Sequence, residues 1–204
     1  MSSRAAILGS IRSHLASSPP AEPVQYVFLP EPTRLTTSVV EVFKQNVEAV
    51  DGHCVVVKTE EEIARILKSF KGRIAISDAP VLKRLVDGES APSAEEIFAF
   101  DVGISTAQAA IAETGTLVLD SARERNRLVS LVPPVHVAIV DASSIFQTLG
   151  EALAFVHHHG NISPAVTFIT GPSRTADIEL TLTIGVHGPQ QLYIIVNEGP
   201  PLAR

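Results

Sequence analysis

Helical and extended patterns of apolar residues alternate along the first half of the chain. Apolar side chains recur at three- and four-residue spacing in some segments and form short unbroken runs in others. The first pattern predicts helices that bury one face, and the second predicts buried strands. In chain order we expect a helix over 39–47, a strand over 53–57, a helix opened by a Thr59–Glu62 capping box, a strand over 73–77 and a helix over 80–86. This order indicates an α/β fold, a mostly parallel sheet with helices on both faces.

The second half of the chain continues the alternation with more strands than helices. After a polar loop over 88–98, we expect strands over 98–104, 107–112, 116–119, 135–140 and 165–170, and one helix over 144–159. Residues 175–184 alternate apolar and polar positions at period two, which predicts a single half-exposed strand. A turn over 185–191 then leads to a last strand over 192–196.

The first 34 residues differ in composition from the rest. A helix capped by Ser2 or Ser3 would place four apolar side chains on one face, those of Ile7, Leu8, Ile11 and Leu15. The same stretch has no acidic residue before Glu22, so it also has the composition of an organellar transit peptide. Five of the 14 prolines lie within 18–34 and predict a linker or surface arm. We therefore expect an N-terminal helix with a Pro-rich arm over 1–34 and one α/β domain over 35–204.

Charge and cysteine content exclude several classes of function. The net charge is −6 and no lysine follows residue 100, so the chain lacks the basic stripe that a nucleic-acid partner requires. A single cysteine, Cys54, excludes an intramolecular disulfide, a structural zinc site and a self-ligated iron–sulfur cluster. The apolar runs are far shorter than the about 20 residues that span a bilayer. We expect a cytoplasmic protein with no membrane span, in which Cys54 is a small core residue.

The stretch Thr170–Asp177 has the composition of an anion site and directly follows a predicted strand. Gly171 lets the backbone approach a ligand, Ser173 and Thr175 supply hydroxyl groups, and Arg174 supplies a guanidinium. This pattern predicts binding of a phosphate or a carboxylate. The alternative is a proline-containing turn in which Arg174 pairs with Asp177 or Glu179.

The second candidate is the turn formed by Glu113, Thr114, Gly115 and Thr116 between two extended segments. A carboxylate held at the rim of a sheet can act as a nucleophile or general base if burial adjusts its pKa. The alternative is a hairpin turn with an exposed glutamate, which the spacing alone favours.

The histidines give one further candidate. Consecutive helical residues diverge by about 100°, so His157–His159 cannot converge on one ion, and we expect no metal site. His187, near two glycines, is the best candidate for an exposed functional imidazole. In one continuous strand, Asp177 and His187 would lie about 33 Å apart, so we expect the site to hold only one of them unless the chain folds back.

Three arginines, Arg123, Arg125 and Arg127, lie in one five-residue window. They fit either the solvated start of a helix or an anion clamp, because a guanidinium binds carboxylates through two parallel hydrogen bonds.

Four motifs occur in order over 112–116 (AETGT), 131–137 (LVPPVHV), 170–179 (TGPSRTADIE) and 185–189 (GVHGP). On these motifs the chain resembles the lactate-utilisation protein C family of LUD-domain proteins. The resemblance implies a fold like that of the sugar-phosphate isomerase and coenzyme A transferase superfamily. It also implies a role in oxidising L-lactate to pyruvate beside two partner proteins that carry iron–sulfur clusters. Val132 and Tyr193 stand where the family pattern has leucine and histidine, and Tyr193 weakens the expectation that a second histidine assists His187.

Two hypotheses follow. In the first, the chain is an accessory subunit of an L-lactate utilisation system that binds no cofactor itself and holds a small anionic ligand. In the second, it is a stand-alone enzyme of isomerase or acyl-transferase type, in which Glu113 acts as base or nucleophile and the 173–175 segment holds the anionic end of the substrate. Both place ligand-binding roles on Thr114, Gly115, Thr116, Gly171, Ser173, Arg174, Thr175, Asp177 and His187.

Overall fold

A computed structural model of the chain describes residues 3–17, 37–90, 92–121, 126–158, 165–176, 182–184 and 188–202. The chain divides into two compact units, Met1–Thr33 and Arg34–Arg204. In the first unit, the helix predicted from apolar spacing is present as α1, Ser3–Ser17. Among the described residues, no helix is both long enough and apolar enough to cross a membrane.

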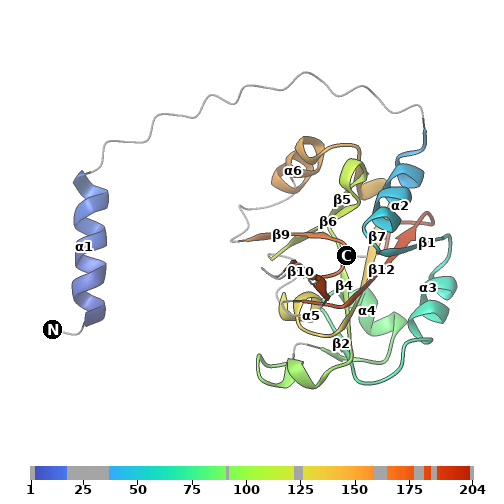
Figure 1. Ribbon diagram of the computed structural model, residues 1–204, viewed down its shortest axis with the longest axis horizontal. Helices are drawn as coiled ribbons and strands as arrows, with labels where there is room; N and C mark the ends of the chain where they lie inside the picture. The colour runs from blue at the N-terminus through green and yellow to red at the C-terminus, as the bar shows by residue number, and fades with distance from the viewer. Residues whose placement is uncertain are drawn as a thin grey trace. The chain divides into compact units, whose positions relative to one another are not determined.

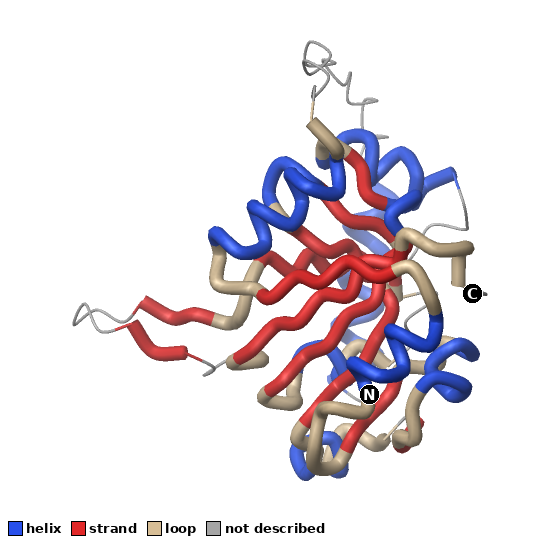
Figure 2. Tube along the Cα trace, turned by 90° about the vertical axis from the view of Figure 1, so that its right-hand side faces the viewer, coloured by secondary structure: helices blue, strands red, loops and turns tan. Residues whose placement is uncertain are grey.

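The larger unit is built on a six-stranded sheet (Figures 1 and 2). Its strands are β1 (His53–Val57), β2 (Ile74–Ile76), β3 (Glu89–Ser90), β4 (Val102–Thr106), β7 (Val135–Asp141) and β12 (Gln191–Asn197). They lie in the order β1-β12-β7-β4-β2-β3, and every neighbouring pair is parallel. The predicted α/β fold with a parallel sheet is therefore confirmed, and the strands other than β3 are apolar because both faces of the sheet are covered.

Two helices cover one face of this sheet, α3 (Glu60–Leu67) and α4 (Pro80–Leu85). Ile63 and Leu82 of these helices are fully buried and pack in one cluster with Ile104, Ile139 and Ile195 of the strands. The predicted capping box opens α3, since the Thr59 hydroxyl accepts from the Glu62 amide at 3.2 Å. In return, the Glu62 carboxylate accepts from the Thr59 amide at 3.2 Å.

The opposite face is covered by a helix and a second sheet. The helix is α2 (Val39–Ala49), and the sheet contains β5 (Ala109–Ile111), β6 (Thr116–Asp120), β8 (Ile145–Phe146) and β9 (Val166–Thr170) in the order β8-β5-β6-β9. Phe43 of α2 and Leu117 of β6 pack against Ala138 and Ile194 of the large sheet. The outer face of the small sheet is covered by α6 (Leu149–His158), beside β5 and β6 in Figure 1.

Three predicted boundaries are wrong for local reasons. The 88–98 loop contains β3 and a 3₁₀ helix over Glu96–Ala99, so the next strand begins at Val102 rather than at residue 98. The helix predicted from residue 144 begins at Leu149, because β8 precedes it and the Thr148 hydroxyl accepts from the Glu151 amide at its start (3.4 Å).

The single strand predicted over 175–184 is also wrong. The chain reverses there, and β10 (Arg174–Ala176) pairs antiparallel with β11 (Leu182–Ile184). Period-two alternation reports which face a side chain occupies, and it carries no information about where a strand turns back. The condition that the chain folds back between residues 176 and 182 is therefore met, and Asp177 and His187 themselves lie outside the described residues.

Candidate functional site

The predicted anion loop connects β9 to β10 and lies against the end of α2. Gly171 has φ of +72°, a left-handed conformation that residues with a Cβ rarely adopt. A Cβ at this position would come within 2.6 Å of the Val50 carbonyl oxygen. Glycine is therefore required here both by the backbone conformation and by the close approach of α2.

Three of the four motifs meet at this loop. The Ser173 amide donates to the Pro189 carbonyl at 2.8 Å, which joins the loop to the turn preceding β12. Together with Leu131 of α5 (Leu128–Leu131), these segments line a groove of about 500 Å³. Its walls come from residues 130–131, 167–174 and 188–189 and from Val50. Segments far apart in the chain thus form one concave surface.

Arg174 is the one charged residue among the described groove-lining residues. Its guanidinium forms an ion pair with Asp51, at the end of α2, and donates to the Val50 carbonyl at 3.4 Å. The Arg174 side chain is 36% exposed and that of Asp51 is 74% exposed, so the pair is solvated. A solvated pair of this kind contributes little stability, and an incoming anion can compete for the guanidinium. The sequence offers Asp177 or Glu179 as the partner of Arg174, and both of these residues lie outside the described part of the chain.

The segment 113–116 contains the predicted glycine turn, but its residues do not line the groove. Gly115 has φ of +64° and packs on α2, where a Cβ would lie 2.5 Å from the Val47 amide nitrogen. Glu113 is exposed and accepts a hydrogen bond from the Leu149 amide at 3.1 Å, at the first residue of α6. Glu113 does not line the groove, and its bond to an unpaired helix N–H explains it as a capping residue.

A line of hydroxyl groups connects this turn with the groove. The Oγ1 atoms of Thr114 and Thr116 are hydrogen-bonded at 2.7 Å. Thr116 Oγ1 is also hydrogen-bonded to Oγ1 of Thr170, at 2.7 Å, and Thr170 lines the groove. Thr116 is buried, whereas Thr114 is exposed. The AETGT motif therefore contacts the edge of the groove through its threonines rather than through its carboxylate.

The remaining predicted residues are described in part or not at all. Thr175 belongs to β10 and pairs with Thr183 of β11, and its side chain is not described. Asp177 and His187 lie outside the described residues, as do Arg123, Arg125 and His159. Arg127 is exposed at the start of α5.

Two buried polar side chains, those of His136 and Ser105, were not among the predicted site residues. His136 of β7 is fully buried, and its Nε2 is 2.8 Å from the Ser105 hydroxyl of β4. Burial lowers the pKa of His136 to about 4, so the imidazole is neutral at physiological pH. Its Nδ1 has no hydrogen-bond partner in the part of the chain that the structure describes. One signal could have identified His136, a histidine inside an otherwise apolar strand, and such a residue is usually buried for packing rather than for function.

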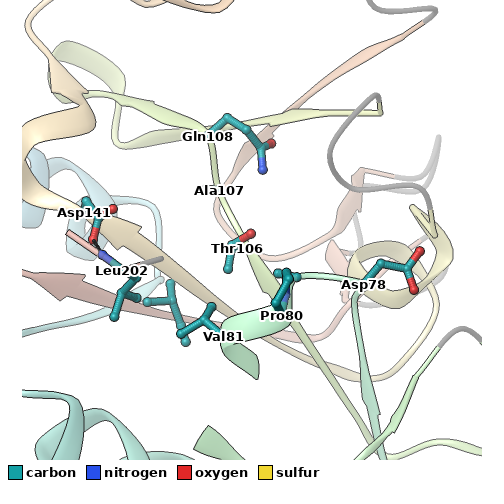
Figure 3. A pocket seen from close by; sticks show the side chains of 10 residues that line it. Asp78, Pro80, Val81, Thr106, Ala107, Gln108, Asp141 and Leu202 are labelled. Carbon is teal, nitrogen blue, oxygen red and sulfur yellow. Dashed lines mark hydrogen bonds between the residues drawn. The ribbon is translucent and has the colours of Figure 1, made fainter. Parts of the chain in front are cut away.

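A second concave site lies at the carboxyl ends of the parallel strands (Figure 3). The cavity has a volume of about 340 Å³, and polar side chains reach it from the ends of three strands. They are Asp78 after β2, Thr106 and Gln108 at and after the end of β4, and Asp141 at the end of β7. The signal that could have predicted it is a polar residue directly after each of several apolar strands, because ligands of α/β proteins bind at that edge.

A parallel six-stranded sheet, covered on one face by helices and on the other by a helix and a second sheet, defines the class of layered α/β domains. The chain belongs to the LUD domain family, whose model matches residues 75–196, more than half of the chain. The family resemblance stated from the motifs is thereby confirmed.

Individual relatives agree with this assignment. A lactate utilization protein C from Geobacillus thermodenitrificans is 41% identical over 103 residues, which cover 48% of this chain and 43% of that protein. One from Exiguobacterium is 38% identical over 144 residues, 66% of this chain and 62% of that protein. An uncharacterized protein from Neisseria meningitidis is 41% identical over 125 residues, 60% of this chain and 54% of that protein. The matched region thus spans less than half the length of the Geobacillus relative.

A solved structure supports the fold. The crystal structure of a DUF162 family protein from Deinococcus radiodurans superposes with a TM-score of 0.61 at 25% sequence identity. The match covers 78% of this chain and 96% of that one. The arrangement of the layers is therefore shared with an experimentally determined relative.

Proposed function

We propose that the chain takes part in L-lactate utilisation in the cytoplasm, as a subunit that binds a small anion in the groove at residues 171–174. The proposal is supported by membership of the LUD domain family and by relatives named lactate utilization protein C. The observation that carries the binding step is Arg174, which lines a groove where three sequence motifs meet. Lactate, pyruvate and phosphate are all small anions that one guanidinium with neighbouring hydroxyls can bind.

Electron transfer is assigned to two partner proteins that carry iron–sulfur clusters. The chain has one cysteine, and such a cluster is held by several thiolates. Cys54 is also buried in the core, and burial raises the pKa of its thiol to about 11. A largely buried thiol with a raised pKa is mostly protonated at neutral pH, which disfavours it as a metal ligand or redox centre.

The partner assignment predicts a growth defect and a co-purifying complex. A strain lacking the gene is expected to grow normally on glucose and poorly on L-lactate as sole carbon source. Tagged protein from lactate-grown cells is expected to co-purify with iron-containing subunits, identified by mass spectrometry and iron analysis. Normal growth on L-lactate together with an iron-free purified protein would refute the role in lactate oxidation.

The binding step predicts that Arg174→Gln weakens binding of L-lactate, pyruvate or phosphate by about tenfold or more, because a charge-assisted hydrogen bond is lost. Isothermal titration calorimetry of the full chain measures each Kd. The matched control is Asp51→Asn, which removes the ion pair but keeps the guanidinium, so it should bind as tightly as the wild type or more tightly. Equal affinity of Arg174→Gln and wild type for all three anions would exclude the groove as the binding site.

A stand-alone enzyme that uses Glu113 is the second candidate. It is favoured by the glycine turn that holds this carboxylate at the rim of the small sheet, and by the hydroxyl line that joins the turn to the groove. Glu113→Gln separates the two proposals, since it should leave anion binding unchanged if Glu113 only caps α6.

A further inference from the structure

The cavity at the carboxyl ends of β2, β4 and β7 is separate from the groove. The groove lies beside the start of β7, where the Gln190 amide donates to the Pro134 carbonyl at 2.7 Å. The cavity lies at the other end of the same strand, at Asp141. Seven residues of strand at about 3.3 Å each place the two sites roughly 20 Å apart, at opposite edges of the sheet.

One wall of the cavity is the end of the described chain, held in place by a set of hydrogen bonds. Asp141 Oδ1 accepts from Asn197 Nδ2 at 2.9 Å and from the Leu202 amide at 3.2 Å. Asn197 Nδ2 also donates to the Pro200 carbonyl at 2.8 Å. These bonds fix Leu202, which is 6% exposed, beside Val81 and Ile139 in the same core cluster. The cavity is therefore a preformed site with a continuous apolar wall.

Three of the four polar side chains, those of Asp78, Thr106 and Gln108, lie away from Leu202, whereas Asp141 lies beside it (Figure 3). Thr106 lies between Gln108 and Pro80, and Asp78 lies at the entrance to α4 (Figure 3). The Ser77 amide donates to the Ile104 carbonyl at 2.9 Å, which sets Asp78 level with Thr106 on the neighbouring strand. The side-chain oxygen of Gln108, Oε1, accepts a hydrogen bond from the backbone amide of Asp120 in β6 at 2.6 Å, so the second sheet fixes this side chain. A ligand would thus meet one apolar side and one polar side.

The carboxyl groups define what that polar side accepts. Carboxylates accept hydrogen bonds and repel anions, which disfavours lactate or phosphate beside Asp78 and Asp141. Two hydrogen bonds from the chain already compensate Asp141, which leaves the half-buried Asp78 to meet a ligand. A hydroxyl group both donates to a carboxylate and accepts from the Thr106 hydroxyl, so a ligand that carries hydroxyl groups can bond to each of the polar groups on this side.

We propose that this cavity binds a compact, uncharged molecule that presents adjacent hydroxyl groups beside an apolar face. That chemistry is shared by a free aldose and by the ribose of a nucleoside. Carboxylates at the carboxyl end of a parallel strand accept ribose hydroxyls in other α/β proteins. The volume of about 340 Å³ is at the lower end of the range for small-molecule cavities, which selects a ligand of this size.

The test is ligand-observed NMR titration of the full chain with D-ribose and, separately, with adenosine. The proposal predicts saturation transfer to at least one of them and an about tenfold weaker Kd in both Thr106→Val and Asp78→Asn, since each removes one hydrogen-bonding group. Asp87→Asn is the matched control, because Asp87 is exposed beyond the other end of α4 and should bind as the wild type does. Binding of D-ribose identifies a free sugar, and binding of adenosine alone identifies a nucleoside.

Three results would overturn the proposal. The first is the absence of saturation transfer from both probes to the folded wild-type protein. The second is binding that both cavity variants retain at full affinity, as judged on samples whose circular dichroism matches that of the wild type. The third is binding that Arg174→Gln abolishes, because the probes would then occupy the groove at the other edge of the sheet.

Discussion

Replacing Gly103 with alanine is expected to destabilise the protein by about 3 kcal/mol, the upper part of the range for overpacking a core. Gly103 is the second residue of β4, and a Cβ there would collide with the Val129 carbonyl of α5 and lie 3.1 Å from Pro133 Cγ. A backbone carbonyl cannot rotate away as the end of a flexible side chain can. Accommodation of the methyl group would therefore move α5, which lines the groove through Leu131.

Equilibrium urea unfolding followed by circular dichroism measures this loss. Gly150→Ala serves as the control, because its nearest neighbour is Thr148 Oγ1 at 4.0 Å and it lies in α6, where alanine is favoured over glycine. The control should match or exceed the wild-type stability. An equal stability of Gly103→Ala and wild type would show that α5 does not depend on this close approach, and anion titration of the variant would then report an intact groove.

Gly103 also marks the limit of what could be predicted about the fold. Five of the six strands of the large sheet were predictable because each is a short apolar run, whereas the polar strand β3 was missed. The interior glycine of β4 indicates that something approaches the strand closely, and the sequence does not identify α5 as that element. Contacts of this kind depend on the packing of segments distant in sequence.

For the candidate site, too, local features were predictable from the sequence and contacts between distant segments were not. The glycine turns at Gly115 and Gly171 were recognised from composition, and both have the left-handed conformation that only glycine adopts easily. That both pack on α2, and that Glu113 caps α6 while Arg174 pairs with Asp51, depends on the tertiary arrangement. Residue types thus predicted which chemistry is present, whereas the fold decides which groups share a site.

The two concave sites follow from different sources of information. The groove was found from motifs, and it lies at the amino end of β7. The cavity follows from the topology, because crossover connections leave the carboxyl edge of a parallel sheet open to ligands. A charged guanidinium at one edge and carboxyl groups at the other give the two sites opposite preferences, so a small anion and a neutral polyol are not expected to compete.

His136 is expected to make the stability of the fold depend on pH between about 6.5 and about 4. In this range the unfolded chain binds a proton on the imidazole, while the buried imidazole of the folded chain stays neutral. The unfolded state therefore binds more protons, and stability falls as pH decreases. From pH 7 to pH 5 the contribution of His136 should fall by about 2 kcal/mol, since each pH unit below the unfolded pKa corresponds to about 1.4 kcal/mol.

His136→Gln isolates this contribution. The glutamine amide nitrogen can replace Nε2 in the 2.8 Å bond to Ser105 but does not titrate. Urea unfolding of both proteins at pH 7 and pH 5 gives two differences in free energy, and the other titrating groups cancel when these are compared. The wild type should lose about 2 kcal/mol more than the variant over this interval. Identical losses would mean that the imidazole is hydrated or paired when protonated, and that a rearrangement of β7 and β4 exposes it in the folded state.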